Sequence, residues 1–394
     1  MRMAHPVPFP IGAEEGVEVS APAIPWYIWC LVAATTSAVI GGVWDISWHK
    51  SIGRDSFWTP AHILIYLCGV MSGFGSGYLI LAATFDRASS LGEASVRMWG
   101  FRGPLGAFLC AWGGAAMLAS APFDDWWHNA YGLDVKVLSP PHVVLILGIV
   151  VIRVGTLVLI AGCRNRASGP LGTRLEWMLL FVGTLLMGGT IGAFLEWITR
   201  NHMHGARFYI VVSLVIPLLL MAVTRASSHR WAATIVGSIF TTLALAFLWI
   251  LPMFPAEPKL GPVYYRVTHF IPNDFPLLIL PACVAVDLVR HRLAGLGRWR
   301  QALILGPVFL AVFAAAQWPF ADFLMTPASR NWFFGTHYIP FFVPPETDYA
   351  RNVFSTAGQT AGSLAFGMAC AFAAAIVSTR LGLGWGDWMG RLRR

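Results

Sequence analysis

The sequence predicts an all-α protein, a polytopic transmembrane helix bundle of about ten spans. Hydrophobic residues make up 57% of the 394 residues, charged residues make up 12%, and the mean hydropathy is +0.64. Such a composition is too apolar for an ordinary soluble domain. Apolar runs long enough to cross about 30 Å of hydrocarbon recur along the chain. The basic residues gather in alternate loops, which is typical of membrane proteins with several spans.

We expect one membrane domain between two polar tails. Residues 1-22 form a polar tail that contains proline and lacks the basic and apolar regions of a cleavable signal peptide. The transmembrane domain is expected over 23-382 and a basic C-terminal tail over 383-394. Apolar stretches bounded by proline, glycine or charge predict the spans 24-44, 60-84, 103-122, 140-162, 175-196, 207-223, 231-252, 274-290, 300-320 and 357-380.

Lysine and arginine indicate the orientation. The loops near 85-102, 163-174, 224-230 and 290-300, together with both tails, hold most of the 27 basic residues. By the positive-inside rule we expect these loops and both termini in the cytoplasm. The other loops, with eight of the eleven histidines, then face the periplasm or exterior of a bacterial-type inner membrane. We therefore interpret the net charge of +8 as an orientation signal, and we expect no nucleic acid as a partner.

An internal repeat carries the candidate chemistry. The hairpins 23-84 and 103-162 resemble each other most, and each joins the end of one span to the start of the next. The first copy has the pattern D-x3-H-x12-H and the second the pattern D-x3-H-x13-H. The residues that match the patterns are Asp45, His49 and His62 in the first copy and Asp124, His128 and His142 in the second.

The spacing predicts that the three side chains of each copy converge. Asp and His four residues apart project from the same face of a helix. Thr59 or Ser139 is a natural N-cap and Pro60 or Pro140 a natural first helical residue, which places the later histidine in the first turn. Two imidazoles and one carboxylate on two rigid helices suit copper, zinc, iron or manganese. The alternative is a proton relay or a structural hydrogen-bond network.

Later loops hold candidates with weaker patterns. The spacing of Glu196, Arg200 and His204 predicts one polar stripe on a helix, either an interfacial salt-bridge stripe or a set of ligands. The remaining polar or metal-binding candidates are His202 beside that stripe, His269, which precedes Asp274, and His337, which follows Asp322.

Arg153 is a charge inside a predicted span. It lies about eleven residues into the fourth span, near the middle of the membrane. An arginine there costs several kcal/mol unless it is paired or hydrated, so such a residue is a functional candidate. The other interpretation is an arginine that reaches the interface with its side chain.

The first motif resembles the copper-site motif of the C subunit of copper membrane monooxygenases, the enzymes that oxidise methane and ammonia. Asp45, His49 and His62 carry this resemblance, which covers about 18 residues. It implies a copper site near the outer side of the membrane and other membrane subunits as partners. This chain departs from that subunit by having more spans and a second copy of the motif with one additional loop residue.

The leading hypothesis is a copper-dependent membrane oxidoreductase, monooxygenase-like, or a subunit of one. Its partners would be the lipid bilayer and a small apolar substrate. The second hypothesis is a transporter or a metal-handling permease, with a metal ion as the substrate, which the broken span at Pro217 and the intramembrane Arg153 favour. The third is a non-catalytic subunit of a respiratory complex.

Overall fold

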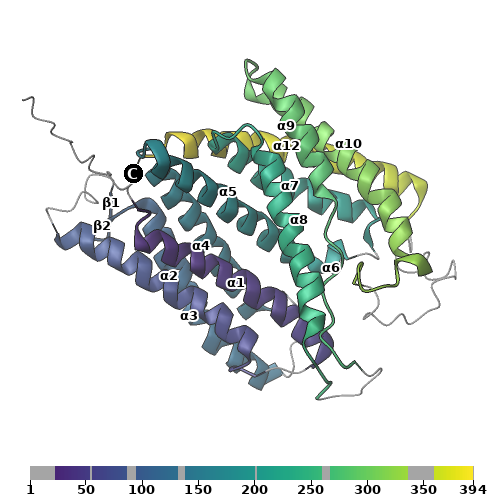
Figure 1. Cartoon of the computed structure of the whole chain (residues 1–394), viewed down its shortest axis with the longest axis horizontal. Coiled ribbons are helices and arrows are strands. Elements are labelled where there is room, and N and C mark those ends of the chain that lie inside the picture. The colour runs from purple at the N-terminus through teal and green to yellow at the C-terminus, as the bar shows by residue number, and fades with distance from the viewer. Residues whose placement is uncertain are drawn as a thin grey trace, which may run out of the picture.

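The protein is a bundle of long helices (Figure 1). The computed structural model describes residues 23–53, 56–86, 95–131, 138–199, 202–259, 267–335 and 359–393. Within these residues nine helices are long and apolar enough to cross a membrane. They are α1 (Trp26–Ser51), α2 (Pro60–Phe85), α3 (Leu105–Tyr131), α4 (Pro140–Arg164), α5 (Gly169–Gly192), α7 (Ala206–Ala226), α8 (Ala232–Ile250, continued by the turn η3, Leu251–Met253), α10 (Arg298–Leu324) and α12 (Ala361–Arg391). The prediction of an all-α, multi-pass membrane protein is confirmed.

The ends of the helices gather at two opposite ends of the bundle. The histidine end contains the last turns of α1 and α3 and the first turns of α2 and α4. The arginine end contains the end of α4, where Asn165 donates hydrogen bonds to the carbonyls of Met389 and Leu392 (both 2.8 Å). Helix α1 also starts there, because the Trp26 ring packs on Tyr78 near the end of α2. The two ends separate the histidine-rich and arginine-rich loops as predicted.

The predicted span 274-290 is helical only from Ile279 onward. Helix α9 (Ile279–Arg290) has 12 residues and is about 18 Å long, which is too short to cross the hydrocarbon alone. The backbone before it has no regular secondary structure, and Leu278 N–H donates to Oε1 of Gln317 in α10 (2.9 Å). This crossing joins the histidine end, where Ile271 N–H donates to Ser51 Oγ, to the arginine end. Non-helical backbone is tolerated inside a bundle where other protein groups hydrogen-bond to its N–H and C=O groups.

Glycine contacts hold the second hairpin together. A Cβ atom on Gly113 of α3 would lie 2.6 Å from the carbonyl oxygen of Gly148 in α4, and one on Gly155 would lie 2.7 Å from the carbonyl oxygen of Gly106. Small residues let membrane helices approach until their backbones touch. The two backbones are therefore fixed relative to each other, including their ends at the histidine end.

Two segments differ from the sequence prediction at the arginine end. The loop 85-102 contains an antiparallel hairpin of β1 (Val96–Met98) and β2 (Phe101–Gly103). Its turn residues, Trp99 and Gly100, both have positive φ angles, as two-residue hairpins require. Helix α12 (Ala361–Arg391) joins residues of the predicted span 357-380 and of the predicted tail 383-394 in one helix.

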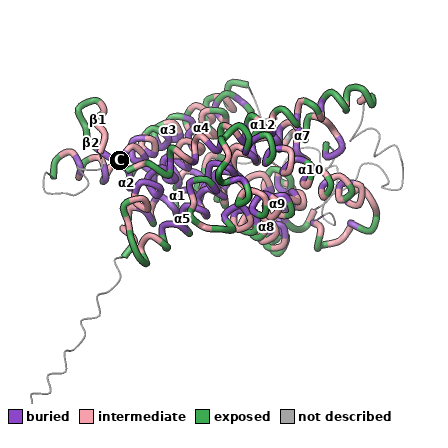
Figure 2. Tube along the Cα trace, turned by 90° about the horizontal axis from the view of Figure 1, so that it is seen from above, coloured by how far each residue is buried: buried purple, intermediate pink, exposed green. Residues whose placement is uncertain are grey.

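The core lies between the central helices. Two-thirds of the spans of α5 and α7 are buried (67% each), whereas 22% of the spans of α8 and α12 are buried. Figure 2 shows the buried residues along the middle of the bundle and exposed residues around it. The exposed side chains include Phe74, Phe366 and Leu381, which suits a surface in contact with lipid. The remaining short elements are α6 (Leu195–Ile198), η4 (His291–Leu293) and η5 (Pro327–Ser329).

Candidate metal centre

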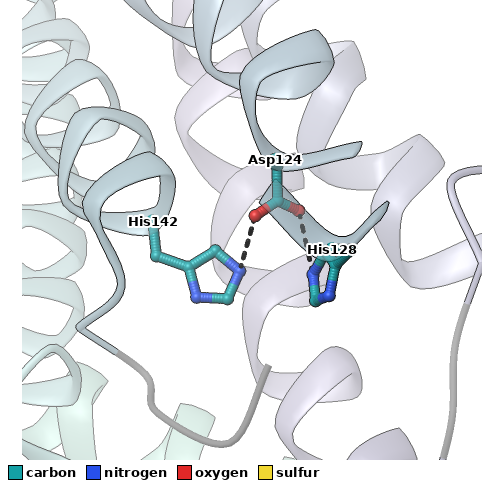
Figure 3. Close-up of side chains that lie close together, drawn as sticks. All are labelled: Asp124, His128 and His142. Atoms are coloured by element: carbon teal, nitrogen blue, oxygen red, sulfur yellow. Dashed lines mark ion pairs between the residues drawn. The ribbon is translucent and has the colours of Figure 1, made fainter. Parts of the chain in front are cut away.

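Asp124, His128 and His142 converge at the histidine end (Figure 3). The carboxylate of Asp124 lies between the two imidazoles. Its Oδ2 is 3.6 Å from Nε2 of His128, and its Oδ1 is 3.5 Å from Nε2 of His142. One ligand atom from each residue can be chosen so that all three lie within 4.8 Å of one another. Between a fifth and a third of each side chain is exposed, so the cluster is open to exchange with the surroundings.

These separations suit ligands of one ion better than direct hydrogen bonds. An N–H···O hydrogen bond spans about 2.7–3.2 Å, which is shorter than both contacts of Asp124. Two ligand atoms that are each about 2.1 Å from a tetrahedral ion are about 3.4 Å apart. The two contacts use different oxygens of Asp124, and with one ligand atom from each residue the three atoms lie within 4.8 Å of one another. Such a group could hold a transition metal, with coordination positions left for water or another ligand.

The fold brings this cluster together as the spacing predicts. Helix α3 passes through Pro122 and continues to Tyr131, so Asp124 and His128 lie one turn apart on the same face. Helix α4 begins at Pro140, which places His142 in its first turn. Ser139 occupies the N-cap position, but its hydroxyl makes no capping hydrogen bond, so the expected side-chain cap is wrong in this detail.

The first copy of the motif has one shorter and one longer contact than the second. Nε2 of His62 is 3.2 Å from Oδ1 of Asp45, whereas Nε2 of His49 is 3.8 Å from Oδ2 and its side chain is 44% exposed. In the described part of the chain, three ligand atoms lie within 4.8 Å of one another in the second copy and not in the first. Thr59 is the N-cap residue of α2 without a capping bond, and its hydroxyl instead accepts from Ser56 N–H (2.8 Å).

No family model, curated protein or solved structure matches this chain. The resemblance of Asp45, His49 and His62 to the copper membrane monooxygenases therefore stays a hypothesis that depends on the motif. The geometry of Asp124, His128 and His142 does not depend on it.

Glu196 and His204, two residues of the predicted polar stripe, do not lie on one helix, and Arg200 lies outside the described residues. Helix α5 ends at Gly192, and α6 covers four residues and places Glu196 in its single turn. The chain has left the helix at Thr199, and α7 begins at Ala206. The spacing assumes one continuous helix from Glu196 to His204, and the structure has no such helix.

His204 instead pairs with Asp322 of α10, which sequence spacing does not indicate. Its Nε2 is 3.3 Å from Oδ1 of Asp322, and the imidazole is buried edge-on against Trp318, with ring centroids 5.0 Å apart. The two residues meet because α7 begins beside the end of α10. Only the tertiary packing reveals this further pair of imidazole and carboxylate at the histidine end.

The other candidate histidines are not gathered into this cluster. His202 is exposed, and its Nδ1 lies 2.8 Å from Thr199 Oγ1. His269 is also exposed, and its Nδ1 lies 2.9 Å from the Thr268 hydroxyl. The segment that follows it is not helical until Ile279, so His269 does not lie at a helix entrance. His337 lies outside the described residues.

Arg153 is buried inside the bundle, as predicted from its position in the fourth span. Its side chain is 4% exposed, and the guanidinium lies against Gly189 of α5 at a point where a Cβ atom would overlap Nη1. Among the described residues, its Nε has no hydrogen-bond acceptor. Its burial favours a position inside the bundle over a side chain that reaches the interface.

Proposed function

We propose that this chain is a membrane metalloprotein whose resident ion is held by Asp124, His128 and His142, with copper as the favoured metal. The observation that carries the proposal is the spacing of the three ligand atoms, all within 4.8 Å of one another on two helices fixed by glycine contacts. Imidazole and carboxylate ligands also accommodate zinc, iron and manganese, which are the alternatives.

We further propose that the site belongs to a copper-dependent oxidoreductase, monooxygenase-like, or to a subunit of one. Bound copper would supply one-electron redox chemistry. The chain itself supplies an orienting carboxylate and two imidazoles in rigid positions. Trp126, Leu138 and Val143 are close to the ligands in sequence and have exposed apolar side chains, which would suit the approach of a small apolar substrate from the lipid. The resemblance of the first motif to copper membrane monooxygenases supports the same class.

The side of the membrane follows from charge. The histidine end carries few basic residues, and the opposite end carries the arginine-rich connections. The positive-inside rule therefore supports a periplasmic or exterior position for the metal site, in a bacterial-type inner membrane. Accessibility of a cysteine introduced at the exposed His269 to a membrane-impermeant reagent tests this assignment.

The metal proposal is tested by elemental analysis of the purified chain beside His128→Ala and His142→Ala. We expect one transition-metal ion in the parent and almost none in either variant. Electron paramagnetic resonance of the oxidised protein then distinguishes copper from zinc, and reduction of the signal tests for redox activity. Equal metal content in the parent and both variants contradicts the site. A bound metal that does not change oxidation state contradicts the oxidoreductase alone.

A metal-handling transporter is the second candidate, and one observation favours it. The crossing that contains α9 is broken, because the backbone before Ile279 is not helical. Discontinuous crossings line the substrate sites of many transporters. Uptake of radioactive metal into proteoliposomes, lost in His142→Ala, supports transport. Metal that stays bound without flux supports the oxidoreductase.

A further inference from the structure

The arginine end contains a cavity of about 510 Å³ between the ends of α7, α9, α10 and α12. Four arginines and one aspartate line it. These residues are Arg225, Arg290, Arg298, Arg391 and Asp387. Arg290 is also paired with Asp287 (2.7 Å). The guanidinium groups therefore exceed the carboxylates by two charges, which favours an anionic ligand.

Asp387 orients two of these arginines and leaves most of their donors available. Nε of Arg225 is 2.5 Å from Oδ1 of Asp387, and Nε of Arg298 is 2.7 Å from Oδ2. Within the part of the chain that the structure describes, the Nη groups of both arginines have no protein acceptor. A single carboxylate thus fixes two guanidinium groups side by side, each with free donors.

The other two arginines differ in their contacts. Arg290 uses its Nη groups to bond the carbonyls of Thr224, His229 and Arg230, so its role is structural. Arg391 bonds the carbonyl of Asp387 through Nε, and among described residues its Nη groups have no acceptor. Three arginines consequently offer donors at the cavity.

We propose that this cavity binds a phosphate group. A planar guanidinium matches two phosphate oxygens at once, and fixed pairs of guanidinium groups add geometric selectivity. Thr224 and Ser227 add hydroxyl groups to the lining. The phosphate can belong to the headgroup of an anionic phospholipid or to a soluble phosphate.

The location of the cavity favours a phospholipid headgroup. Trp299 and Trp388 directly follow Arg298 and Asp387 in sequence, and both rings are exposed. Tryptophan is enriched at the level of the headgroups. Basic pockets between transmembrane helices bind the headgroups of anionic lipids.

The full-length protein is tested with two probes. Inorganic phosphate is added to the protein in detergent, and phosphatidylglycerol is supplied by reconstitution into phosphatidylcholine nanodiscs with or without this lipid. The variants are Arg225→Gln and Arg298→Gln, and the matched control is Arg300→Gln, an exposed arginine of the same helix outside the cavity lining. Native mass spectrometry measures retained phosphatidylglycerol, and thermal unfolding measures the stabilisation that each probe adds. Because each variant is compared with and without the probe, a lower basal stability does not affect the result.

We expect Arg225→Gln and Arg298→Gln each to weaken phosphate-group binding roughly tenfold or more, because each removes a charge-assisted, two-point contact. Arg300→Gln should leave it unchanged. Stabilisation by phosphatidylglycerol alone identifies a lipid headgroup, and stabilisation by inorganic phosphate as well identifies a soluble ligand. Binding that is equal in the parent and both cavity variants, or that falls as much in Arg300→Gln, overturns the proposal.

Discussion

Asp124 and His142 lie 3.5 Å apart at their carboxylate and imidazole atoms, although they belong to different helices. The contact joins the last turns of α3 to the first turn of α4 at the histidine end. The same carboxylate faces His128 with its other oxygen at 3.6 Å. Because the contact crosses a helical hairpin, it depends on the packing of two rigid elements and not on a flexible loop. Changes to either the ligands or the packing should therefore be visible as loss of metal.

Replacement of either imidazole should abolish tight binding. In His128→Ala or His142→Ala, two of the three ligands remain, and the affinity for a transition metal should fall by more than the roughly 10- to 100-fold that loss of an outer ligand partner costs. His269→Ala, an exposed histidine of the same end, should bind as the parent does. Competition titration with a chromogenic chelator measures the affinities. A comparable loss in His269→Ala would indicate adventitious binding by surface histidines.

The two copies of the motif should differ in function. Since His49 is 44% exposed and 3.8 Å from Asp45, we expect the first copy to bind a metal less tightly than the second. At substoichiometric copper, His128→Ala should lose the bound ion and His49→Ala should keep it. Elemental analysis after gel filtration separates bound from free metal. The opposite pattern would assign the site to the first copy and favour the family resemblance over the geometry.

The fold was largely predictable because a bilayer requires long apolar helices and excludes most other structures. The exception is instructive. Sequence hydropathy treats 274-290 like any other span, yet the helix starts only at Ile279. Gln317, far along the chain, satisfies the backbone N–H of Leu278. Hydropathy does not contain that information, since it depends on which side chain the packing places there.

The candidate metal site was predictable to the extent that it is local. Asp124 and His128 share a helix face, and the proline that starts α4 fixes the position of His142, so spacing predicts their convergence. The difference between the two copies was not predictable, because one loop residue does not report the distance across a hairpin. The pair of His204 and Asp322 and the cavity at Arg298 join distant helices, so neither has a local sequence signal.

The glycine contact in the second hairpin should support the metal site. In Gly113→Ala, the new Cβ would lie 2.6 Å from the carbonyl oxygen of Gly148, so α3 and α4 must move apart. We expect a loss of roughly 1–3 kcal/mol in stability, typical of overpacking, together with weaker metal binding. Gly77→Ala in α2, where a Cβ meets nothing within 4 Å, is the control and should change neither quantity. Thermal unfolding and the chelator titration are measured on both variants. Unchanged metal affinity in a destabilised Gly113→Ala would show that the metal site does not depend on this packing contact.

Asp287 should be essential for the arginine end. It is fully buried and accepts hydrogen bonds from Thr234 N–H (2.7 Å) and Oγ1 (2.8 Å) and from Arg290 Nε (2.7 Å). Asp287→Ala leaves Arg290 without its partner and should cost about 3–5 kcal/mol. Thr234→Val removes one of these bonds and should cost about 1 kcal/mol. Thermal unfolding in detergent measures both, and equal effects would show that the carboxylate itself contributes little.

The contact between Arg153 and Gly189 predicts a coupled pair of substitutions. In Gly189→Ala the new methyl group would occupy the position of the guanidinium, so a buried charge must move within the bundle. We expect this variant to lose roughly 1–3 kcal/mol of stability. Arg153→Met removes the charge and frees the space next to Gly189. In that background, the alanine at 189 should cost much less, because its Cβ no longer meets Nη1.

A double-mutant cycle of Arg153→Met and Gly189→Ala measures this coupling, with thermal unfolding of the four proteins in the same detergent. A coupling energy above about 0.5 kcal/mol indicates direct contact, whereas additive effects indicate that the two residues act independently. Metal content of the same proteins adds a functional comparison. Arg153 lies on α4, the helix that also carries His142. If the guanidinium helps to position this helix, Arg153→Met should lower the metal content. Full metal content in Arg153→Met would restrict the arginine to a role within the span.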